Sequence, residues 1–163
     1  MKAVLWLTVA VVVGAAVSGR GQQPAQPAHA AKADMPAAVF KNYDDLKWDR
    51  ILPDLGPKSP EICILHVDAR TRATKLLIRT PAAIHVRKHW HSGNETHTMV
   101  VGTAEFGCDD QRVKQGPGSF NYLPARMVHE AWTSAGSVVF ITVDTAWDVN
   151  WVEGAPTAAD LTK

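Results

Sequence analysis

The sequence predicts an all-β domain, and three observations support this. From Phe40 onward, short runs of alternating or continuous apolar residues follow one another without a sustained helical period. Gly, Pro, Asp and Asn separate these runs at short intervals, as they do in sandwiches and barrels. The 163 residues suit one compact domain, and no internal repeat suggests a tandem pair. We therefore expect a single β-sandwich or β-barrel.

The expected strands cover residues 49–52, 61–68, 74–80, 85–91, 96–106, 119–123, 129–133, 137–144 and 148–152. Turn residues fall between them, for example Ser92-Gly93-Asn94 and Gly116-Pro117-Gly118. The run over 96–106 is expected to be one long strand.

The first 21 residues have the pattern of a secretory signal peptide, with Lys2, an apolar run over 3–17 and small residues up to Gly21. An uncleaved membrane anchor is the alternative, but the run is shorter than the roughly 20 residues that a spanning helix needs. Residues 22–38 are rich in Gln, Pro and Ala, which predicts a flexible linker. The domain is then expected over 39–155, with a loose tail over 156–163. Such a protein is exported to the periplasm or secreted.

Composition excludes two classes of partner. Lys and Arg total 17 against 16 Asp and Glu, and no basic cluster is present to neutralise phosphates, so we expect no nucleic-acid binding. No second apolar stretch is long enough to span a bilayer, so we expect no membrane contact after signal cleavage.

The sequence has two cysteines, Cys63 and Cys108, so one disulfide bond is possible. The alternative is that both are small buried apolar residues.

Metal-ligating residue types gather near the middle of the chain. His89 and His91 are two residues apart in a strand-like run, so both imidazoles are expected on one face. The turn at 92–94 reverses the chain, which predicts that Glu95 opens a neighbouring antiparallel strand close by. His129 begins another apolar strand and is the candidate fourth ligand. These ligand types predict one first-row divalent ion, Zn, Cu, Fe, Mn, Ni or Co, and do not favour Ca or Mg.

The spacing of these residues resembles the two motifs of the cupin superfamily. The first motif is matched by His89-x-His91, three residues, Glu95, six residues and Gly102, and most of the second by Gly118, five residues, Pro124, four residues and His129. The resemblance is to small secreted single-domain cupins (monocupins) and spans nearly the whole expected domain. It implies a cupin-type β-barrel, that is, a double-stranded β-helix or jelly roll, whose metal ligands are His89, His91, Glu95 and His129.

Three positions depart from the cupin pattern. Ala83 stands where the first motif begins with Gly, Arg126 where the second has its inner Gly, and Thr133 where the second ends in Asn. None of the three is a ligand, so the departures concern loop geometry and not the metal.

Other polar residues are candidates for supporting roles. His85 lies four residues before His89, and His97 lies two residues after Glu95. Because side chains alternate along a strand, both are expected on the same face as the ligands, so either could line the pocket or orient a ligand. Glu95, His97 and Arg126 are the candidate catalytic residues, and Glu130 is a further candidate for substrate contact or proton transfer. The tryptophans are expected mostly in packing and at the rim, although any one could stack on a ligand.

Four protein ligands leave room for a substrate on the ion, so we expect a metalloenzyme of the oxygenase or oxidoreductase type, dioxygenase-like, acting on a small oxygen-rich molecule. The resemblance also allows a cupin isomerase or decarboxylase. A non-catalytic protein that binds a metal or a small metabolite is the second hypothesis, and a structural barrel that forms a homodimer is the third. The partner in the first two cases is a small molecule.

Overall fold

The computed structural model of the chain describes residues 37–162. The expected signal peptide over 1–21 and most of the expected linker over 22–38 lie outside these residues. The fold belongs to the unit that begins at Phe40. Within the described range, no helix has the length and apolar character needed to cross a membrane.

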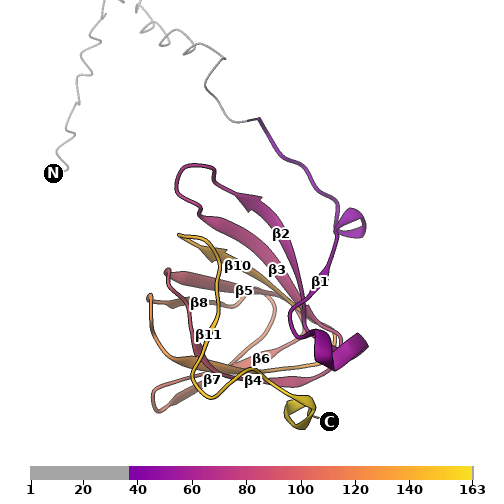
Figure 1. Cartoon of the computed structure of the whole chain (residues 1–163), viewed down its shortest axis with the longest axis vertical. Helices are drawn as coiled ribbons and strands as arrows, with labels where there is room; N and C mark the ends of the chain where they lie inside the picture. The colour runs from indigo at the N-terminus through magenta and orange to yellow at the C-terminus, as the bar shows by residue number, and fades with distance from the viewer. Residues whose placement is uncertain (1–36, 163) are drawn as a thin grey trace, which may run out of the picture. The chain divides into compact units, whose positions relative to one another are not determined.

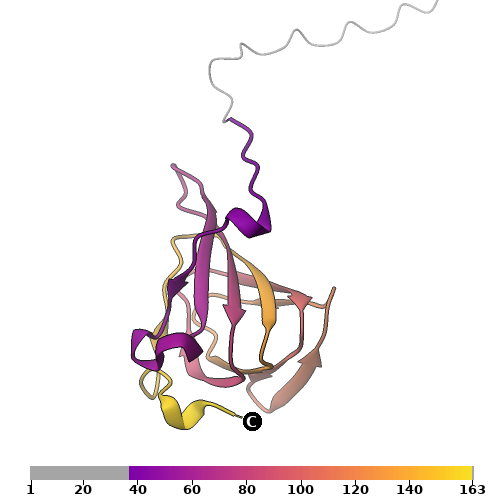
Figure 2. The ribbon, with the colours of Figure 1, turned by 90° about the vertical axis from the view of Figure 1, so that its right-hand side faces the viewer.

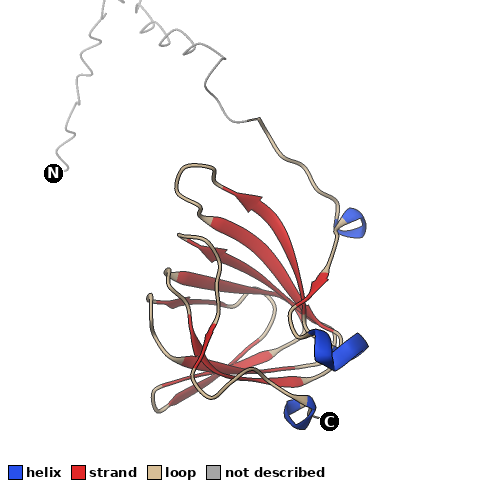
Figure 3. Ribbon diagram, viewed as in Figure 1, coloured by secondary structure: helices blue, strands red, loops and turns tan. Residues whose placement is uncertain are grey.

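The domain consists of two antiparallel sheets that face each other (Figures 1 and 3). The six-stranded sheet has the order β1 (Asp49–Arg50), β2 (Glu61–Val67), β3 (Thr74–Thr80), β10 (Ser137–Val143), β5 (Glu95–Val101), β8 (Phe120–Leu123). The five-stranded sheet has the order β11 (Asn150–Trp151), β4 (Ile84–Trp90), β9 (His129–Thr133), β6 (Ala104–Cys108), β7 (Gln111–Gln115). The short 3-10 helices are η1 (Tyr43–Asp45), η2 (Pro53–Lys58) and η3 (Ala158–Asp160). This is the all-β jelly-roll architecture that the sequence predicts.

The core of the six-stranded sheet forms where alternating apolar residues of neighbouring strands meet. Leu76 on β3 and Ile141 and Val143 on β10 are at most 3% exposed and pack together. The register places Ile141 opposite Leu76 and, on the other side, opposite His97. Because side chains alternate along a strand, this register fixes which residues of β5 face the interior.

The expected single strand over 96–106 is instead two strands in different sheets, β5 and β6. The chain crosses between the sheets at Gly102, whose φ is 72°. A Cβ at this position would lie 2.8 Å from the backbone of Ser137, so the crossing has room only for glycine. Periodicity did not reveal the break, because apolar residues lie on both sides of Gly102 and one glycine does not end the run within a short window.

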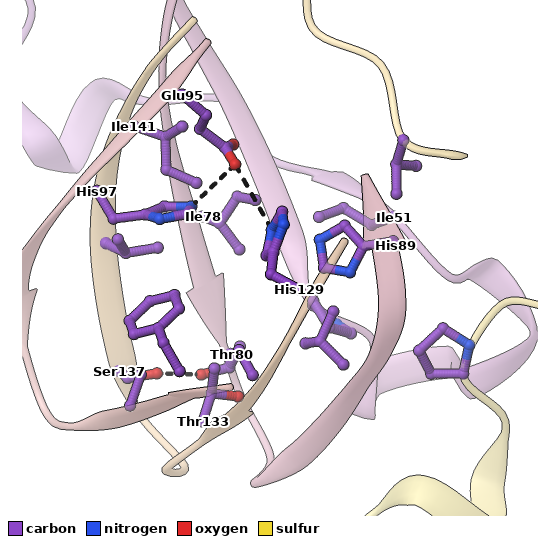
Figure 4. A pocket seen from close by; sticks show the side chains of 18 of the residues that line it. Ile51, Ile78, Thr80, His89, Glu95, His97, His129, Thr133, Ser137 and Ile141 are labelled. Carbon is purple, nitrogen blue, oxygen red and sulfur yellow. Dashed lines mark hydrogen bonds and ion pairs between the residues drawn. The ribbon is translucent and has the colours of Figure 1, made fainter. Parts of the chain in front are cut away.

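The turn at 92–94 also differs from the expectation of an antiparallel neighbour. It connects β4 of one sheet to β5 of the other, so these strands do not pair. Glu95 nevertheless lies close to the histidines: its Oε2 atom is 3.2 Å from Nε2 of His91, and Figure 4 shows Glu95 next to His129.

The strand β7 had no counterpart in the sequence prediction. It lies at the edge of the five-stranded sheet and pairs only with β6. Its sequence, Gln-Arg-Val-Lys-Gln, has one apolar side chain, and its first four residues are exposed. An edge strand without a buried face leaves no alternating pattern to detect.

The expected loose tail over 156–163 packs against the domain over its described part (Figure 2). Leu161 forms a bridge with Ile84, and Asp160 lies 2.8 Å from the guanidinium of Arg87 on β4. Thr157 caps η3 through a reciprocal pair of hydrogen bonds with Asp160. A single apolar residue and a capping box are too short a signal to predict a packed segment from sequence.

Both cysteines are free thiols. Cys63 is buried, as expected for a small apolar residue, whereas Cys108 is partly exposed at the end of β6.

Candidate metal centre

A β-bulge in β4 turns the histidines of this strand in opposite directions. Val86 pairs with Ala131 and His89 pairs with His129, so three steps on β4 match two on β9. Regular alternation would place Val86 and His89, three positions apart, on opposite faces, but the extra residue makes both face the interior. His85 therefore points outward, where it stacks on Trp132 at 4.5 Å between ring centroids. The expectation that His85 shares the ligand face is wrong for this reason.

Three imidazoles converge in the cavity between the sheets, and Figure 4 shows two of them, His89 and His129, side by side. His89, His91 and His129 each place one ring nitrogen within 4.8 Å of the others, and each side chain is at most 6% exposed. His89 lies on β4, His91 follows β4 directly, and His129 opens β9. The three histidines that the sequence spacing singled out thus lie together in the structure.

All three rings are held by the backbone through the same atom, Nδ1. The Nδ1 atom of His89 lies 2.7 Å from the carbonyl of Arg87, and that of His129 lies 3.1 Å from the carbonyl of Met127. The Nδ1 atom of His91 is hydrogen-bonded to the carbonyl of Asp148. Since a carbonyl only accepts, Nδ1 carries the proton in each ring and Nε2 is left with a free lone pair. This is the tautomer that binds a metal through Nε2.

Burial keeps the imidazoles of His89 and His129 neutral. It lowers the pKa of His89 to about 3, with a further contribution from the neighbouring His129. Burial also lowers the pKa of His129 to about 4. Neutral imidazole is the form that a metal requires, so these groups need not lose a proton to bind one near neutral pH.

Glu95 adds a carboxylate to the histidine cluster. Its Oε2 atom lies 3.2 Å from Nε2 of His91 and 3.8 Å from Nε2 of His129. Burial raises the pKa of this group, but the surrounding imidazoles, first that of His97, outweigh burial and lower the pKa to about 2. The same oxygen is buried and has no hydrogen-bond partner among the described residues. Imidazoles surround this oxygen at 3.2–3.8 Å, but it accepts no hydrogen bond from them, so a bound cation would complete the site.

His97 lies beside Glu95 and belongs to a chain of side-chain hydrogen bonds. Its Nε2 is 3.3 Å from Oε2 of Glu95, and its Nδ1 is 2.8 Å from Oδ1 of Asn121. Asn121 in turn donates to Gln115 at 3.0 Å, which orients the amide so that its oxygen faces His97. Burial alone lowers the pKa of His97, but the charge of Glu95 outweighs it and raises the pKa. The parity argument placed His97 on the ligand face, and it lines the cavity.

The turn that carries His91 and Glu95 is fixed by two aspartates of the 144–148 loop. The backbone N–H of Ser92 donates to Asp148 at 2.9 Å, and the backbone N–H of Asn94 donates to Asp144 at 2.9 Å. Gly93 lies between these anchor points and is buried. A Cβ there would contact Thr145 Oγ1 and lie 2.7 Å from Asp144 Oδ1, so the loop closes directly over the glycine.

Arg126 and Glu130 lie outside the cavity. Arg126 is exposed, and its contribution to the site is a backbone N–H that donates to the carbonyl of His91 at 2.9 Å. Its φ of 65° lies in the left-handed region, which explains why the cupin pattern has Gly at this position. Glu130 alternates with the inward His129 and faces the outer surface, where it lies 2.7 Å from His85.

Two tryptophans border the histidines. The ring centroid of Trp151 lies 5.2 Å from that of His89, and the ring centroid of Trp147 lies 6.1 Å from that of His91. The indole N–H of Trp147 is buried and has no hydrogen-bond partner among the described residues. Sequence reasoning placed most tryptophans in packing, because nothing in their spacing distinguishes a pocket wall from a core.

The fold matches solved structures, although no protein-family model and no curated protein matches the sequence. An RmlC-like cupin from Shewanella frigidimarina has a TM-score of 0.57 at 15% identity, covering 68% of this chain and 93% of that chain. KdgF from a Halomonas species has a TM-score of 0.55 at 15% identity, covering 65% and 94%. The polyketide cyclase RemF from Streptomyces resistomycificus has a TM-score of 0.57 at 18% identity, covering 73% and 88%. These TM-scores establish a shared fold, and at 15–18% identity no ligand or activity can be assigned to this chain from them.

Proposed function

We propose that this cupin-fold domain is a metalloenzyme that holds one first-row divalent transition metal on its three clustered histidines and Glu95 and acts on a small organic molecule. The observation that carries the proposal is the Oε2 atom of Glu95, which is buried beside the three clustered imidazoles and accepts no hydrogen bond from any described residue. Two types of donor, imidazole nitrogen and carboxylate oxygen, suit Zn, Cu, Fe, Mn, Ni or Co. The identity of the ion is left to experiment.

The chain's residues have separable tasks around such an ion. When bound, the metal supplies a Lewis acid with positions free for a ligand. Glu95 lowers the net charge of the site, and the backbone carbonyls that accept from Nδ1 hold the imidazoles in place. His97 is the one histidine of the cavity outside the ligand set, and its Nε2 lies where a proton could be held next to Glu95. We assign His97 as the candidate acid or base.

The proposed reaction class is that of an oxygenase or oxidoreductase, with isomerase or decarboxylase chemistry as the alternative. One of the matching structures is a polyketide cyclase, which shows that this fold can support catalysis. We do not assign the cyclase reaction to this chain. We further propose that the protein is exported, since residues 1–21 have the pattern of a signal peptide. An exported chain would acquire its metal in the periplasm or outside the cell.

The first test is elemental analysis of the chain purified without chelator or nickel affinity resin. We expect about one ion per chain, since one complete ligand set is present. His129→Ala and Glu95→Ala should lose the ion while their circular dichroism stays unchanged. The matched control is His66→Ala, because His66 is exposed on β2 and lies outside the site. Absence of metal after reconstitution with each of the six ions would overturn the proposal.

A second test separates enzyme from binding protein. Each metal-loaded form is incubated with a panel of small organic acids, enols and diols, with and without dioxygen, and the products are identified by mass spectrometry. An enzyme turns over at least one compound, and His129→Ala abolishes that turnover. A protein that keeps its metal but converts no compound would favour the non-catalytic hypothesis.

A further inference from the structure

The cavity beside the histidines is apolar along most of its length. Its volume is about 100 Å³, and it lies between the two sheets. Its walls come from both sheets, and the apolar lining includes Ile78, Met99, Val139, Ile141, Phe106 and Ala131. Among the described residues that line it, Glu95 is the only carboxylate, and no Lys or Arg is present. Polar recognition is therefore concentrated at the histidine end.

Hydroxyl groups occur at the opposite end, but their hydrogens are already committed. Thr80 Oγ1 donates to the carbonyl of Ser134 at 3.0 Å, and Thr133 Oγ1 donates to the carbonyl of Ile84 at 3.3 Å. Ser137 Oγ is hydrogen-bonded to Thr80 Oγ1, so it uses its own hydrogen there. Figure 4 shows these groups at the far side of the cavity from Glu95. An oxygen placed at this end would find no free donor.

Charge favours an anion at the histidine end. Imidazoles that hold an ion through Nε2 and carry a proton on Nδ1 are neutral, so a divalent ion with Glu95 leaves a net positive charge. The apolar walls offer no counter-ion. The buried indole N–H of Trp147 adds a free donor on the same cavity. A carboxylate head satisfies both the charge and this donor.

Size limits the rest of the ligand. An apolar cavity of about 150 Å³ holds benzene, so about 100 Å³ suits a body of roughly four to six non-hydrogen atoms. Every hydroxyl on such a body would lose its hydrogen bonds to water without gaining a partner, which costs about 1–3 kcal/mol for each group.

We propose that the site binds short carboxylates with an apolar body, with the carboxylate at the histidine end and the hydrocarbon between the sheets. This rests on the proposed metal site and deepens it. The sequence predicts a small oxygen-rich ligand, and the cavity restricts this class to molecules whose oxygen atoms all lie at one end. The indole N–H of Trp147 is assigned to donate a hydrogen bond to the carboxylate. Ala104 on β6, which is 2% exposed, lines the space for the hydrocarbon body.

The test is calorimetric binding to the full chain loaded with Zn, which has a readout independent of turnover. The probes are hexanoate, glycerate as the oxygen-rich anion, and hexanol as the neutral apolar molecule. We expect hexanoate to bind at least about ten times more tightly than either. Equal or tighter binding of glycerate or hexanol overturns the inference.

Two variants locate the binding. Ala104→Leu fills the cavity and should reduce hexanoate affinity at least about tenfold with unchanged zinc content, and Trp147→Phe should reduce it by a similar factor. Hexanoate binding that survives Ala104→Leu would place the ligand elsewhere and overturn the inference. If Ala104→Leu fails to fold, the comparison of probes on the unaltered chain still decides. A chain that holds no metal overturns both proposals, whereas a zinc-loaded chain without preference for hexanoate overturns this one alone.

Discussion

Replacing Gly93 with Ala should damage stability and metal binding together, because this glycine lies under the loop that fixes the ligand-bearing turn. The added Cβ would lie 2.7 Å from Asp144 Oδ1 and 2.9 Å from Val143 Cγ1, in addition to its contact with Thr145. Val143 belongs to the core, so it has little room to move. Overpacking of this kind costs about 1–3 kcal/mol. Displacing Asp144 from the N–H of Asn94 adds about 1.5–3 kcal/mol for a charged hydrogen bond.

The expected loss is therefore about 2.5–6 kcal/mol, a large share of the roughly 5–15 kcal/mol that keeps such a domain folded. Urea unfolding measures it, and elemental analysis of the same sample measures the metal. Gly116→Ala is the matched control, since a Cβ there meets nothing within 4 Å and φ is not in the left-handed region. We expect the control to stay within about 0.5 kcal/mol of the wild type. A Gly93→Ala protein within about 1 kcal/mol of the wild type and with full metal content would refute the account of this turn.

Three further predictions concern the surroundings of the site. Arg126→Gly should raise the free energy of unfolding by about 1 kcal/mol, because it removes a left-handed φ from an exposed arginine; a lower urea midpoint would contradict this. The metal-free chain should lose about 2 kcal/mol of stability for each of His89 and His129 between about pH 7 and about pH 5. The folded pKa values, about 3 and about 4, lie below the unfolded value of 6.5, so the unfolded state takes up more protons and stability falls as pH falls. Urea midpoints at each pH test this, and a flat profile would contradict the burial argument. Asp148→Ala should weaken metal binding by about 10–100-fold, because the carboxylate anchors Ser92 next to His91. Competition with a chromophoric chelator measures the metal affinity, and an unchanged affinity would show that the loop does not position His91.

The histidine cluster could be predicted from sequence because it depends on local rules. Alternation along a strand aligned His89 with His91, and the position of His129 at a strand start was visible from the pattern around it. The position of Glu95 was predicted correctly for the wrong reason, since the turn before it crosses between sheets and does not form a hairpin. Proximity in that case comes from the packing of two sheets, which spacing alone does not encode.

The remaining errors arise where one residue changes the register. The bulge in β4 reverses the direction of His85, and Gly102 divides a continuous apolar run between two sheets. Neither feature alters composition or periodicity enough to be detected in a short window. The apolar nature of the cavity was likewise hidden, because the same residues would be predicted for a filled core.

The bulge in β4 also means that this strand serves two purposes at once. Its inward His89 belongs to the candidate metal centre, while the outward Arg87 holds Asp160 of the C-terminal segment at 2.8 Å. The carbonyl of the same Arg87 accepts from the imidazole of His89. Removing Lys88 would restore regular alternation with Val86 and His89 still inward, but it would place His89 directly after Arg87, so the hydrogen bond between Nδ1 of His89 and the carbonyl two residues before it would be lost. A redesign that lengthens or trims the C-terminus likewise has to keep the pairing of Arg87 with Asp160 intact.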